Sequence, residues 1–568
     1  MNTINAAGIK RRRQISSEFS ASSSTSVSES PPTADLMSIE EFMHHKDAYR
    51  VAPTYQITTP WPFRQGPPTT VGEDVFANEE ITIRGLLNDL KVEPASIVMR
   101  SIWPKGAQAE AQDCLIVDTK DEQPITWVKA AVEIHRLLMK TNLKSQPFKV
   151  EIRNTNKMYA DVSSALHNDE SLLGYIADVK NELKKVINQK LPNAWASLAF
   201  HMRSGKFNHG EERPTAIVYV KPGSKFRFAS IEQQLVDSTR STKFPNVHLN
   251  IEITPGEVLL ADPPHDPSLP RPQKYMLLKS TMPKNGVSIG LTGPDNAVES
   301  GSLGGWLKLT HKRTGKEHLG WTTCYHCVEK GDPDGKDDND VSGIGLHDIH
   351  ASLVPDIGLV WPSQYDSNYS MKLLQQMAKD NVASQTHLKC IEVLKQLEAN
   401  GAFGKVRFAS GHDVRTPKGA RLDWAFVESP GSIQQNAPPE KLTQQQLREI
   451  EYEPTPSQRV TSWRAPKVGE WVIRSGRTSL RQGTINRVGR SIKWENRPES
   501  EEMEVVGIDD EFGDAGDSGS WVLDQRFNLV GVMFGVDSRG SENCGVITPI
   551  QDLIEDIEKR TGCIVTLP

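Results

Sequence analysis

The sequence has few cysteines, no long apolar run and no excess of positive charge. Its six cysteines are spread over 568 residues, and only Cys324 and Cys327 lie close together, which is unlike a disulfide framework. No run of about 18 apolar residues occurs, so we expect no transmembrane helix. The N-terminus also lacks the apolar stretch of a secretory signal. We therefore predict an intracellular protein.

Residues 1–50 contain the Ser/Pro-rich stretch SSEFSASSSTSVSESPPT, whose low apolar content predicts disorder. The basic cluster from Lys10 to Arg13 is either a nuclear-localisation signal or a chance feature of such a tail. We expect a cytoplasmic protein and leave the nucleus open. The net charge of −6 shows no excess of positive charge that would attract nucleic acid, so we expect neither nucleic acid nor a membrane as a partner.

A chain of this length predicts two or three domains. Residues 51–251 alternate strand-like and helix-like segments, and the same order occurs twice. ASIVMR begins at Ala95 and ASLAFH at Ala196, an offset of 101 residues, and the pair VEI (150–152) and IEI (251–253) has the same offset. A constant offset over several elements predicts a tandem duplication of an α/β unit.

Neither copy contains a phosphate-binding loop, a metal-ligand spacing or a carboxylate pair, so we predict no cofactor and an interaction or regulatory role for this half. Residues 252–275 are dense in proline and predict a linker or extended arm. Residues 276–568 contain many short strand-like runs between turn residues, which predicts an all-β barrel or sandwich. One helical insertion (370–400) and a last helix (550–562) interrupt that pattern.

The stretch GDAGDSGSWV (513–522) places Ser518 in a glycine-rich turn before an apolar run. It is either a plain turn or the loop of a nucleophile, which would need a base and a third group that orients the base. His326 ends the strand-like run LGWTTCYHCV, and Asp423 opens LDWAFVE. A carboxylate at the start of an apolar strand is costly to bury unless it meets a hydrogen-bond donor, and a histidine would be one.

These residues resemble the chymotrypsin-like (trypsin-fold) serine peptidases. The resemblance covers 276–568, and the motifs in chain order are GGWLKL (304–309), TTCYHC (322–327), LDWAFV (422–427), SGRTSLRQGTIN (475–486), GDSGS (516–520) and LVGVMFG (529–535). The order His, Asp, Ser is the one this family has. The resemblance implies a double β-barrel and an endopeptidase that acts on protein or peptide substrates without a metal or cofactor.

The resemblance also implies roles for individual residues. His326 would be the general base and then the acid, Asp423 its orienting partner, and Ser518 the nucleophile. The backbone N–H groups of Gly516 and Ser518 would form the oxyanion hole.

Several positions depart from the family pattern. Leu303 matches the position of the cysteine that would bond to Cys327, so the usual disulfide is absent. No activation site precedes the domain, so Asp517 is expected to lack the N-terminal partner that secreted enzymes provide. Phe512 lies six residues before Ser518, at the position that forms the base of the primary specificity pocket in this family. A bulky phenylalanine there favours a shallow apolar pocket. Four acids lie near Phe512, namely Asp509, Asp510, Glu511 and Asp514. They either attract basic substrates or form a solvent-exposed run of charges.

Three alternatives to a constitutive peptidase remain. Cys324, His326 and Cys327 could bind zinc with His347 or His350, although no second Cys/His pair has a suitable spacing. The trypsin fold could instead serve as a non-catalytic binding or signalling scaffold. In a variant of the peptidase hypothesis, residues 51–275 form an inhibitory prosegment that the enzyme cleaves itself.

Overall fold

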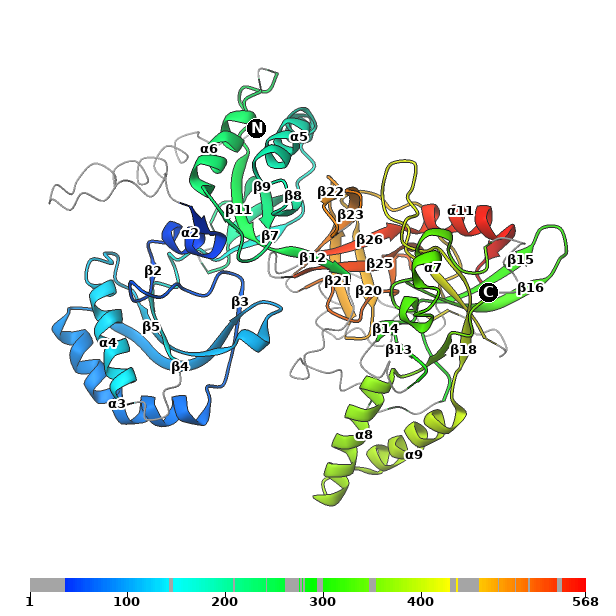
Figure 1. The fold of residues 1–568 in the computed structure, drawn as a ribbon, viewed down its shortest axis with the longest axis horizontal. Helices are drawn as coiled ribbons and strands as arrows, with labels where there is room; N and C mark the ends of the chain where they lie inside the picture. The colour runs from blue at the N-terminus through cyan, green and yellow to red at the C-terminus, as the bar shows by residue number, and fades with distance from the viewer. Residues whose placement is uncertain are drawn as a thin grey trace.

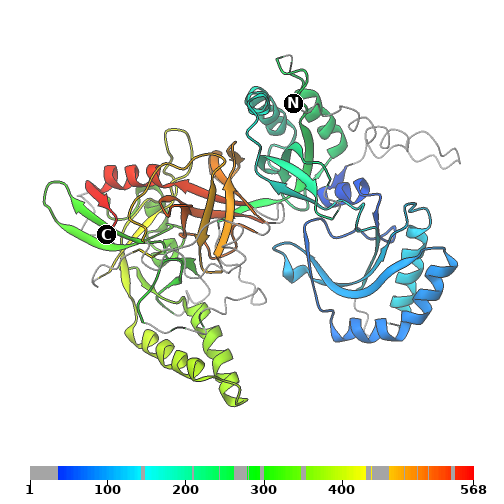
Figure 2. The same ribbon diagram turned by 180° about the vertical axis from the view of Figure 1, so that it is seen from behind.

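The computed structural model describes residues 36–568 with several gaps in between. The gaps are 142–146, 208–209, 242, 261–274, 276–277, 279–280, 294–299, 347–353, 430–435, 438–458, 479, 496, 509–510 and 539–543. Two α/β units form the N-terminal half, and a β-rich body with a helical hairpin forms the rest (Figures 1 and 2).

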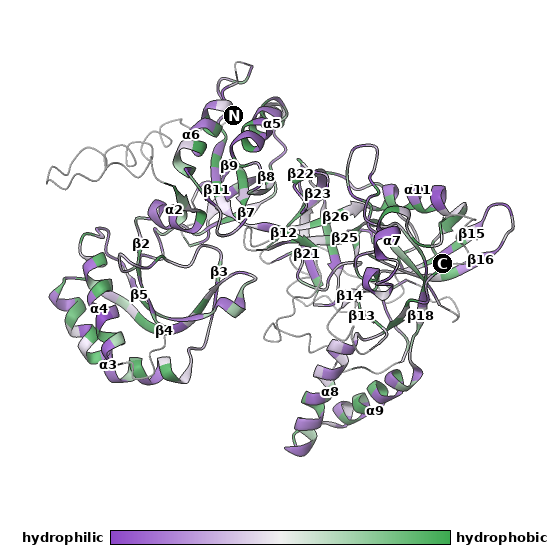
Figure 3. Ribbon diagram, viewed as in Figure 1, coloured by the Kyte–Doolittle hydropathy of each residue, from purple (hydrophilic) through white to green (hydrophobic). Residues whose placement is uncertain are grey.

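The first α/β unit has a five-stranded sheet in the order β2-β6-β5-β4-β3. Its elements are β2 (Arg50–Val51), β3 (Phe63–Gly66), α3 (Thr70–Asp89), β4 (Pro94–Pro104), β5 (Gln112–Thr119), α4 (Trp127–Thr141) and β6 (Lys149–Arg153). Apolar residues recur at helical spacing in α4 and form one face, so that Trp127, Ile134 and Leu138 are buried in the core with the strands. The alternation is visible as bands along this helix in Figure 3.

The second unit has the same order of helix, two antiparallel strands, helix and parallel strand. Its elements are β7 (Asp161–Ser164), α5 (Glu170–Lys190), β8 (Trp195–Gly205), β9 (Arg213–Val220), α6 (Phe228–Ser238) and β11 (Asn250–Pro255). Strand β8 begins 195 − 94 = 101 residues after β4, and α6 begins 228 − 127 = 101 residues after α4. These two pairs of elements therefore have the offset found in the sequence.

Part of the N-terminal tail is ordered. Strand β1 (Met37–Ser38) pairs with β10 (Lys225–Phe226), and helix α2 (Ile39–Lys46) buries Ile39 and Phe42 in the core of the second unit. Ser38 and Glu41 form a capping box that starts this helix. The prediction of disorder over residues 1–50 is therefore wrong for residues 37–50, while residues 1–35 lie outside the described range.

The second unit is joined to the β-rich body by strand pairing. Strand β8 pairs with β22 (Arg490–Ile492), which extends the sheet of the second unit into the body. Strand β12 (Glu257–Leu260) follows β11 directly and pairs with β25 (Leu529–Ser538). The predicted linker at 252–275 is thus wrong up to Leu260, because this stretch belongs to two strands, and 261–274 is not described.

Six antiparallel strands of the body close into a barrel. Each strand is hydrogen-bonded to the next in the ring β20-β21-β23-β26-β25-β24, and β24 pairs back to β20. They are β20 (Trp471–Ser475), β21 (Leu480–Ile485), β23 (Ser500–Gly507), β24 (Trp521–Asp524), β25 and β26 (Cys544–Pro549). This barrel agrees with the β-rich architecture predicted for the C-terminal half.

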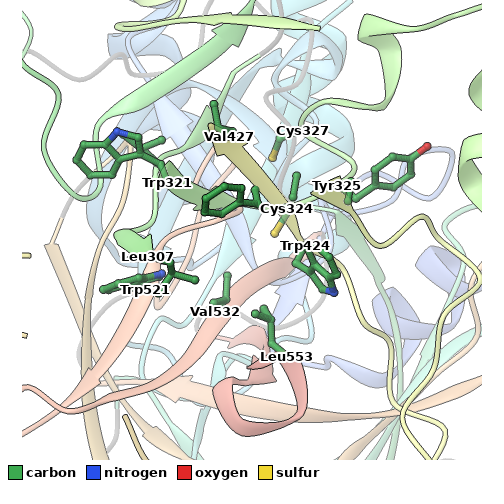
Figure 4. Packing of buried hydrophobic residues seen from close by; sticks show 14 of the residues in the cluster. Leu307, Trp321, Cys324, Tyr325, Cys327, Trp424, Val427, Trp521, Val532 and Leu553 are labelled. Carbon is green, nitrogen blue, oxygen red and sulfur yellow. The ribbon is translucent and has the colours of Figure 1, made fainter. Parts of the chain in front are cut away.

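A second curved sheet lies beside this barrel, in the order β14-β13-β17-β18-β19-β16-β15-β27. Its strands are β13 (Ser288–Leu291), β14 (Gly301–Ser302), β15 (Trp306–His311), β16 (Glu317–Thr323), β17 (Gly358–Val360), β18 (Gly404–Ala409), β19 (Ala425–Glu428) and β27 (Cys563–Thr566). The Gly304 amide donates to the Thr322 carbonyl (2.7 Å), which brings the chain after β14 back to β16. Residues of both sheets share one hydrophobic cluster, part of which is drawn in Figure 4.

Helices flank the two sheets. The predicted insertion at 370–400 is a hairpin of α8 (Gln364–Lys379) and α9 (Gln385–Asn400), which projects from the body (Figure 1). A short helix α7 (Lys336–Ser342) precedes it. The predicted last helix is α11 (Ile550–Thr561), which begins behind Pro549 and ends at Gly562 with a φ of +67°.

Membrane-spanning helices and disulfides are the two remaining features that the sequence analysis addressed. Over the ranges that the structure describes, no helix is both long and apolar enough to cross a membrane. All six cysteines are buried free thiols.

Candidate active site

The three predicted catalytic residues come from three loops between the two sheets. His326 lies just after β16, Asp423 just before β19, and Ser518 in the turn between β23 and β24. The end of β16 pairs with the start of β19, with Thr323 opposite Ala425. This register brings the loops of His326 and Asp423 together.

His326 and Asp423 form a buried pair. The Nδ1 of His326 lies 2.7 Å from Oδ2 of Asp423, and both side chains are 0% exposed. The other carboxylate oxygen accepts the backbone N–H groups of Tyr325 (2.7 Å) and His326 (3.3 Å). A carboxylate held in this way keeps the proton of the histidine on Nδ1 and leaves Nε2 as the basic nitrogen. The sequence-based pairing of these two residues therefore agrees with the geometry.

A buried arginine lies against the same carboxylate. The Nη2 of Arg421 is 3.1 Å from Oδ2 of Asp423, and the guanidinium also contacts Nδ1 of His412 and the ring of Trp494. Burial by itself raises the pKa of Asp423, but the nearby His326 and Arg421 outweigh it and hold that pKa well below its usual range. The carboxylate therefore stays ionised. Arg421 stands two residues before Asp423 in the sequence, and sequence reasoning missed it.

The Ser518 loop lies against the His326 loop. The hydroxyl of Ser518 donates to the carbonyl of Phe534 (3.1 Å), and the Sγ of Cys327 lies 3.8 Å from the carbonyl oxygen of Ser518. A Cβ on Gly301 would lie 2.5 Å from that same sulfur. Gly301 therefore lies close against Cys327. A disulfide is absent here, because Gly301 carries no thiol.

The backbone of the Ser518 loop presents two N–H groups without internal partners. Gly516 has a φ of +86°, and its carbonyl accepts the Ser302 hydroxyl (2.9 Å). The carbonyl of Ala515 accepts Nη1 of Arg477 (3.2 Å), so the N–H of Gly516, on the opposite side of the same planar peptide, points away from Arg477. In the described parts of the chain, neither the Gly516 nor the Ser518 amide donates a hydrogen bond. The two amides predicted as oxyanion donors therefore have no hydrogen-bond acceptor within the described residues.

Arg477 is itself fixed by the helical hairpin. Its Nε and Nη2 donate to the two oxygens of Asp366 at 2.8 and 2.7 Å, and its backbone N–H donates to the Ser302 hydroxyl (2.7 Å). Both side chains of the ion pair are buried. The first turn of α8, where Asp366 lies, is thus connected through Arg477 to the loop that carries Gly516.

Asp517 has an internal counter-ion that the sequence analysis did not identify. Its Oδ2 lies 2.7 Å from Nη2 of Arg474, and both side chains are 0% exposed. The carboxylate also accepts the N–H and hydroxyl of Thr478 and the N–H of Asp514. The expectation concerned only an N-terminal partner, and the structure adds a partner that was not foreseen, Arg474 of β20. The only sequence signal was a charged residue within the apolar strand WVIRS.

The region where a primary pocket is predicted is filled by apolar side chains. Phe512 is 0% exposed and packs in one cluster with Met533 and Val536. A Cβ on Gly513 would lie 1.8 Å from Cε of Met533, and one on Gly545 would lie 2.8 Å from the Phe512 ring. Phe512 therefore lies in a closely packed apolar cluster, and the shallow pocket stays a prediction.

Of the acids near Phe512 that the structure describes, Glu511 forms ion pairs and Asp514 is exposed. Glu511 pairs with Arg64 and Lys105 of the first α/β unit, the latter at 3.4 Å, so its charge is compensated within the chain. Asp514 is exposed, and Asp509 and Asp510 lie outside the described residues.

The zinc alternative is only partly matched by the structure. Ligand atoms of Cys324, His326 and Asp423 lie within 4.8 Å of one another, but Cys327 does not belong to that group. Nδ1 of His326 is occupied by Asp423. Burial raises the pKa of Cys324 well above its usual value, which opposes the thiolate that zinc needs. His347 and His350 fall outside the described residues.

A separate cavity of about 490 Å³ lies away from these residues, between the two α/β units. Its lining includes Ile57, Pro62, Pro104, Gly223 and Pro255. It contains none of the three predicted catalytic residues.

No protein-family model matches the chain, and no curated protein matches it. Several solved structures resemble half of it. A glutamic-acid-specific serine protease, described as using a histidine triad in substrate binding, is 13% identical with a TM-score of 0.27, and covers 50% of this chain and 100% of its own. Protease A of Thermobifida fusca is 14% identical with a TM-score of 0.26, covering 50% and 98%. The chymotrypsin of Cellulomonas bogoriensis is 15% identical with a TM-score of 0.25, covering 50% and 98%. Likenesses at these values carry no argument about activity.

Proposed function

We propose that the chain is a trypsin-like serine endopeptidase with His326, Asp423 and Ser518 as its triad. The observation that carries the proposal is the buried His326–Asp423 pair, whose Nδ1–Oδ2 distance is 2.7 Å, beside a serine loop with two amides that donate no internal hydrogen bond. Leaving a buried backbone N–H without an acceptor costs free energy, so two such amides in one turn are not expected from a structural role alone.

The proposed reaction proceeds in two steps. Ser518 turns from the Phe534 carbonyl toward Nε2 of His326, which takes the hydroxyl proton as the oxygen attacks the substrate carbonyl. The N–H groups of Gly516 and Ser518 stabilise the resulting oxyanion. The protonated His326 then gives its proton to the leaving amine, and an acyl-enzyme remains on Ser518. Water, activated by the same histidine, attacks the acyl group and releases the acid product and the free serine.

The filled region around Phe512 favours substrates with a small apolar residue before the scissile bond. The negative charge of Asp423 stabilises the imidazolium that forms in each step, and Arg421 keeps that carboxylate ionised. The Arg474–Asp517 pair takes the place of an activation cleavage, because the loop has its counter-ion without a new N-terminus.

The two α/β units are, in this proposal, a duplicated regulatory or substrate-recruiting module. The common offset of 101 residues between matching elements supports the duplication. The pairing of β8 with β22 favours a module that stays attached over a prosegment that is released. We propose a cytoplasmic or nuclear location for the enzyme, with protein or peptide substrates as its partners and without a cofactor.

A fluorophosphonate probe tests the proposal directly. The wild-type chain is expected to form a covalent adduct at Ser518, and Ser518→Ala is expected to form none. Ser520→Ala is the matched control, because Ser520 is also buried in the same loop and has no assigned role. A folded wild type that never labels and does not hydrolyse peptides would contradict the proposal and favour a binding scaffold with the same fold.

A further inference from the structure

The edge of strand β25 next to the nucleophile is occupied by the chain itself. Strand β12 runs antiparallel to β25, with Glu257 opposite Ser538, Leu259 opposite Val536 and Leu260 opposite Gly535. Strand β26 pairs with the other edge of the same part of β25. Figure 1 shows β12 entering the barrel from the side of the second α/β unit.

This pairing ends next to the candidate nucleophile. The Ser518 hydroxyl meets the carbonyl of Phe534, and the following residue, Gly535, is opposite the last residue of β12. A peptide attacked by Ser518 must bring its carbonyl close to Phe534. If it binds by adding a strand to β25, the residues before its scissile bond need the same backbone groups that β12 uses.

The side chains of β12 alternate as those of a bound extended peptide would. Val258 and Leu260 are half-buried and pack against the hydrophobic cluster of the two sheets, whereas Leu259 between them is 47% exposed. Successive residues of a strand point to opposite faces, so only alternate positions contact the enzyme. The edge therefore accommodates apolar residues at two positions separated by one solvent-facing residue.

The strand is held at this edge by the second α/β unit. It follows β11 directly, and the amide of Gly256 between them donates to the carbonyl of Val220 in β9 (2.9 Å). The unit itself is fixed to the barrel by the β8–β22 pairing and by the buried contact of His201 with Glu504 (2.9 Å). A tethered strand has a high effective concentration at its own edge, so it competes with a free peptide.

We propose that residues 257–260 are a resident substrate mimic that occupies the substrate-binding edge of β25 and must be displaced before a peptide is cleaved. The proposal rests on the proposed peptidase function and adds its regulation and its preference for alternate apolar residues. Displacement is controlled by the second unit, because that unit sets the position of the strand. A partner that moves the unit away from the barrel activates the enzyme.

The test compares two surface changes on the same strand. Val258→Asp/Leu260→Asp removes the two packed side chains, whereas Leu259→Asp, the matched control, changes the exposed one. Two rates are measured in the full-length chain: hydrolysis of a tetrapeptide amide with apolar residues at alternate positions, and labelling by a small alkyl fluorophosphonate that does not extend along β25.

The double variant is expected to lower the KM for the tetrapeptide by about tenfold, which corresponds to an edge that is free about a tenth of the time in the wild type. Its labelling rate should change less than about twofold, and Leu259→Asp should leave both rates unchanged. An unchanged KM in a folded double variant would overturn the proposal. Failure of every form to label would contradict the peptidase function itself.

A second variant does not depend on loosening the strand. Leu259→Cys/Val536→Cys places two thiols on directly opposed residues, and oxidation would lock the strand on β25. Hydrolysis of the tetrapeptide should be lost on oxidation and return on reduction, while fluorophosphonate labelling persists in both states. The reduced form controls for the substitutions. Equal hydrolysis by the oxidised, cross-linked form and the reduced form would also overturn the proposal.

Discussion

Replacing Arg474 by methionine should destabilise the barrel and disorganise the nucleophile loop. The substitution removes the guanidinium that lies 2.7 Å from the carboxylate of Asp517 and leaves that charge fully buried. It also removes the Nε donor to the carbonyl of Phe512, six residues before Ser518. Methionine has a similar length, so the main loss is electrostatic and not one of packing.

The magnitude follows from the burial of both partners. Breaking a buried ion pair by removing one partner costs about 3–5 kcal/mol. Asp517 keeps the N–H of Asp514 and the N–H and hydroxyl of Thr478 as donors, so we expect the lower end, about 3 kcal/mol. A protein with a net stability of about 5–15 kcal/mol would remain folded after this loss.

Urea denaturation of the full chain, followed by tryptophan fluorescence, measures the change in the free energy of unfolding. Arg474→Met/Asp517→Asn removes the unpaired charge and should recover more than half of the loss. Arg464→Met is the control, because the Arg464 side chain is 29% exposed in its pairs with Glu470 and Asp524 and should contribute less than about 1 kcal/mol. A cost below about 1 kcal/mol for Arg474→Met, or no recovery in the double variant, would refute the reasoning.

Three further predictions follow from other buried contacts. Arg477→Met should lower the kcat of peptide hydrolysis about 10- to 100-fold with little change in KM, because the guanidinium orients an oxyanion donor; an equal rise in KM would contradict this role. Arg421→Met should shift the acid limb of the kcat/KM profile to a pH about 0.5–1 unit higher, because Asp423 would then stabilise the imidazolium of His326 more strongly. An unshifted pH–rate profile would count against this prediction. The pKa of Glu504 is lowered from 4.5 to about 2, since burial, which raises it, is outweighed by His201 and other donors. The contribution of the Glu504 carboxylate to the free energy of unfolding is therefore complete above pH 4.5 and is lost as the pH falls toward 2. Glu504→Gln should accordingly make the free energy of unfolding depend less on pH in this acid range. An unchanged dependence on pH would contradict the pairing.

Local patterns in the sequence were sufficient to predict several elements and to propose the residues of the candidate site. The last helix, predicted over 550–562, is observed over Ile550–Thr561. His326, Asp423 and Ser518 were recognisable as candidates because their motifs and their order resemble those of the trypsin-fold peptidases. The offset of 101 residues was visible in the sequence, and the starts of β4 and β8 and of α4 and α6 have the same offset.

The partners of the charged groups were not predictable in the same way. Arg474 and Asp517 are 43 residues apart, and Arg477 and Asp366 are 111 apart, so no local pattern connects them. The ordered α2 was missed because a single short helix is stable only through its contacts with the second unit. The close approach of Gly301 to Cys327 was not foreseen either, because the two residues are far apart in the sequence.

The sequence by itself determined which residues are candidates for the proposed chemistry, because a candidate nucleophile, base and orienting carboxylate are chosen by residue type and motif order. The tertiary structure alone decided which charges neutralise one another and which strand lies on which edge. Strand pairing joins backbone groups that any residue carries, so the run EVLL within a proline-rich segment gave no sign that it would pair with residues 535–538. That pairing depends on the position of the whole second unit, which no short stretch of sequence encodes.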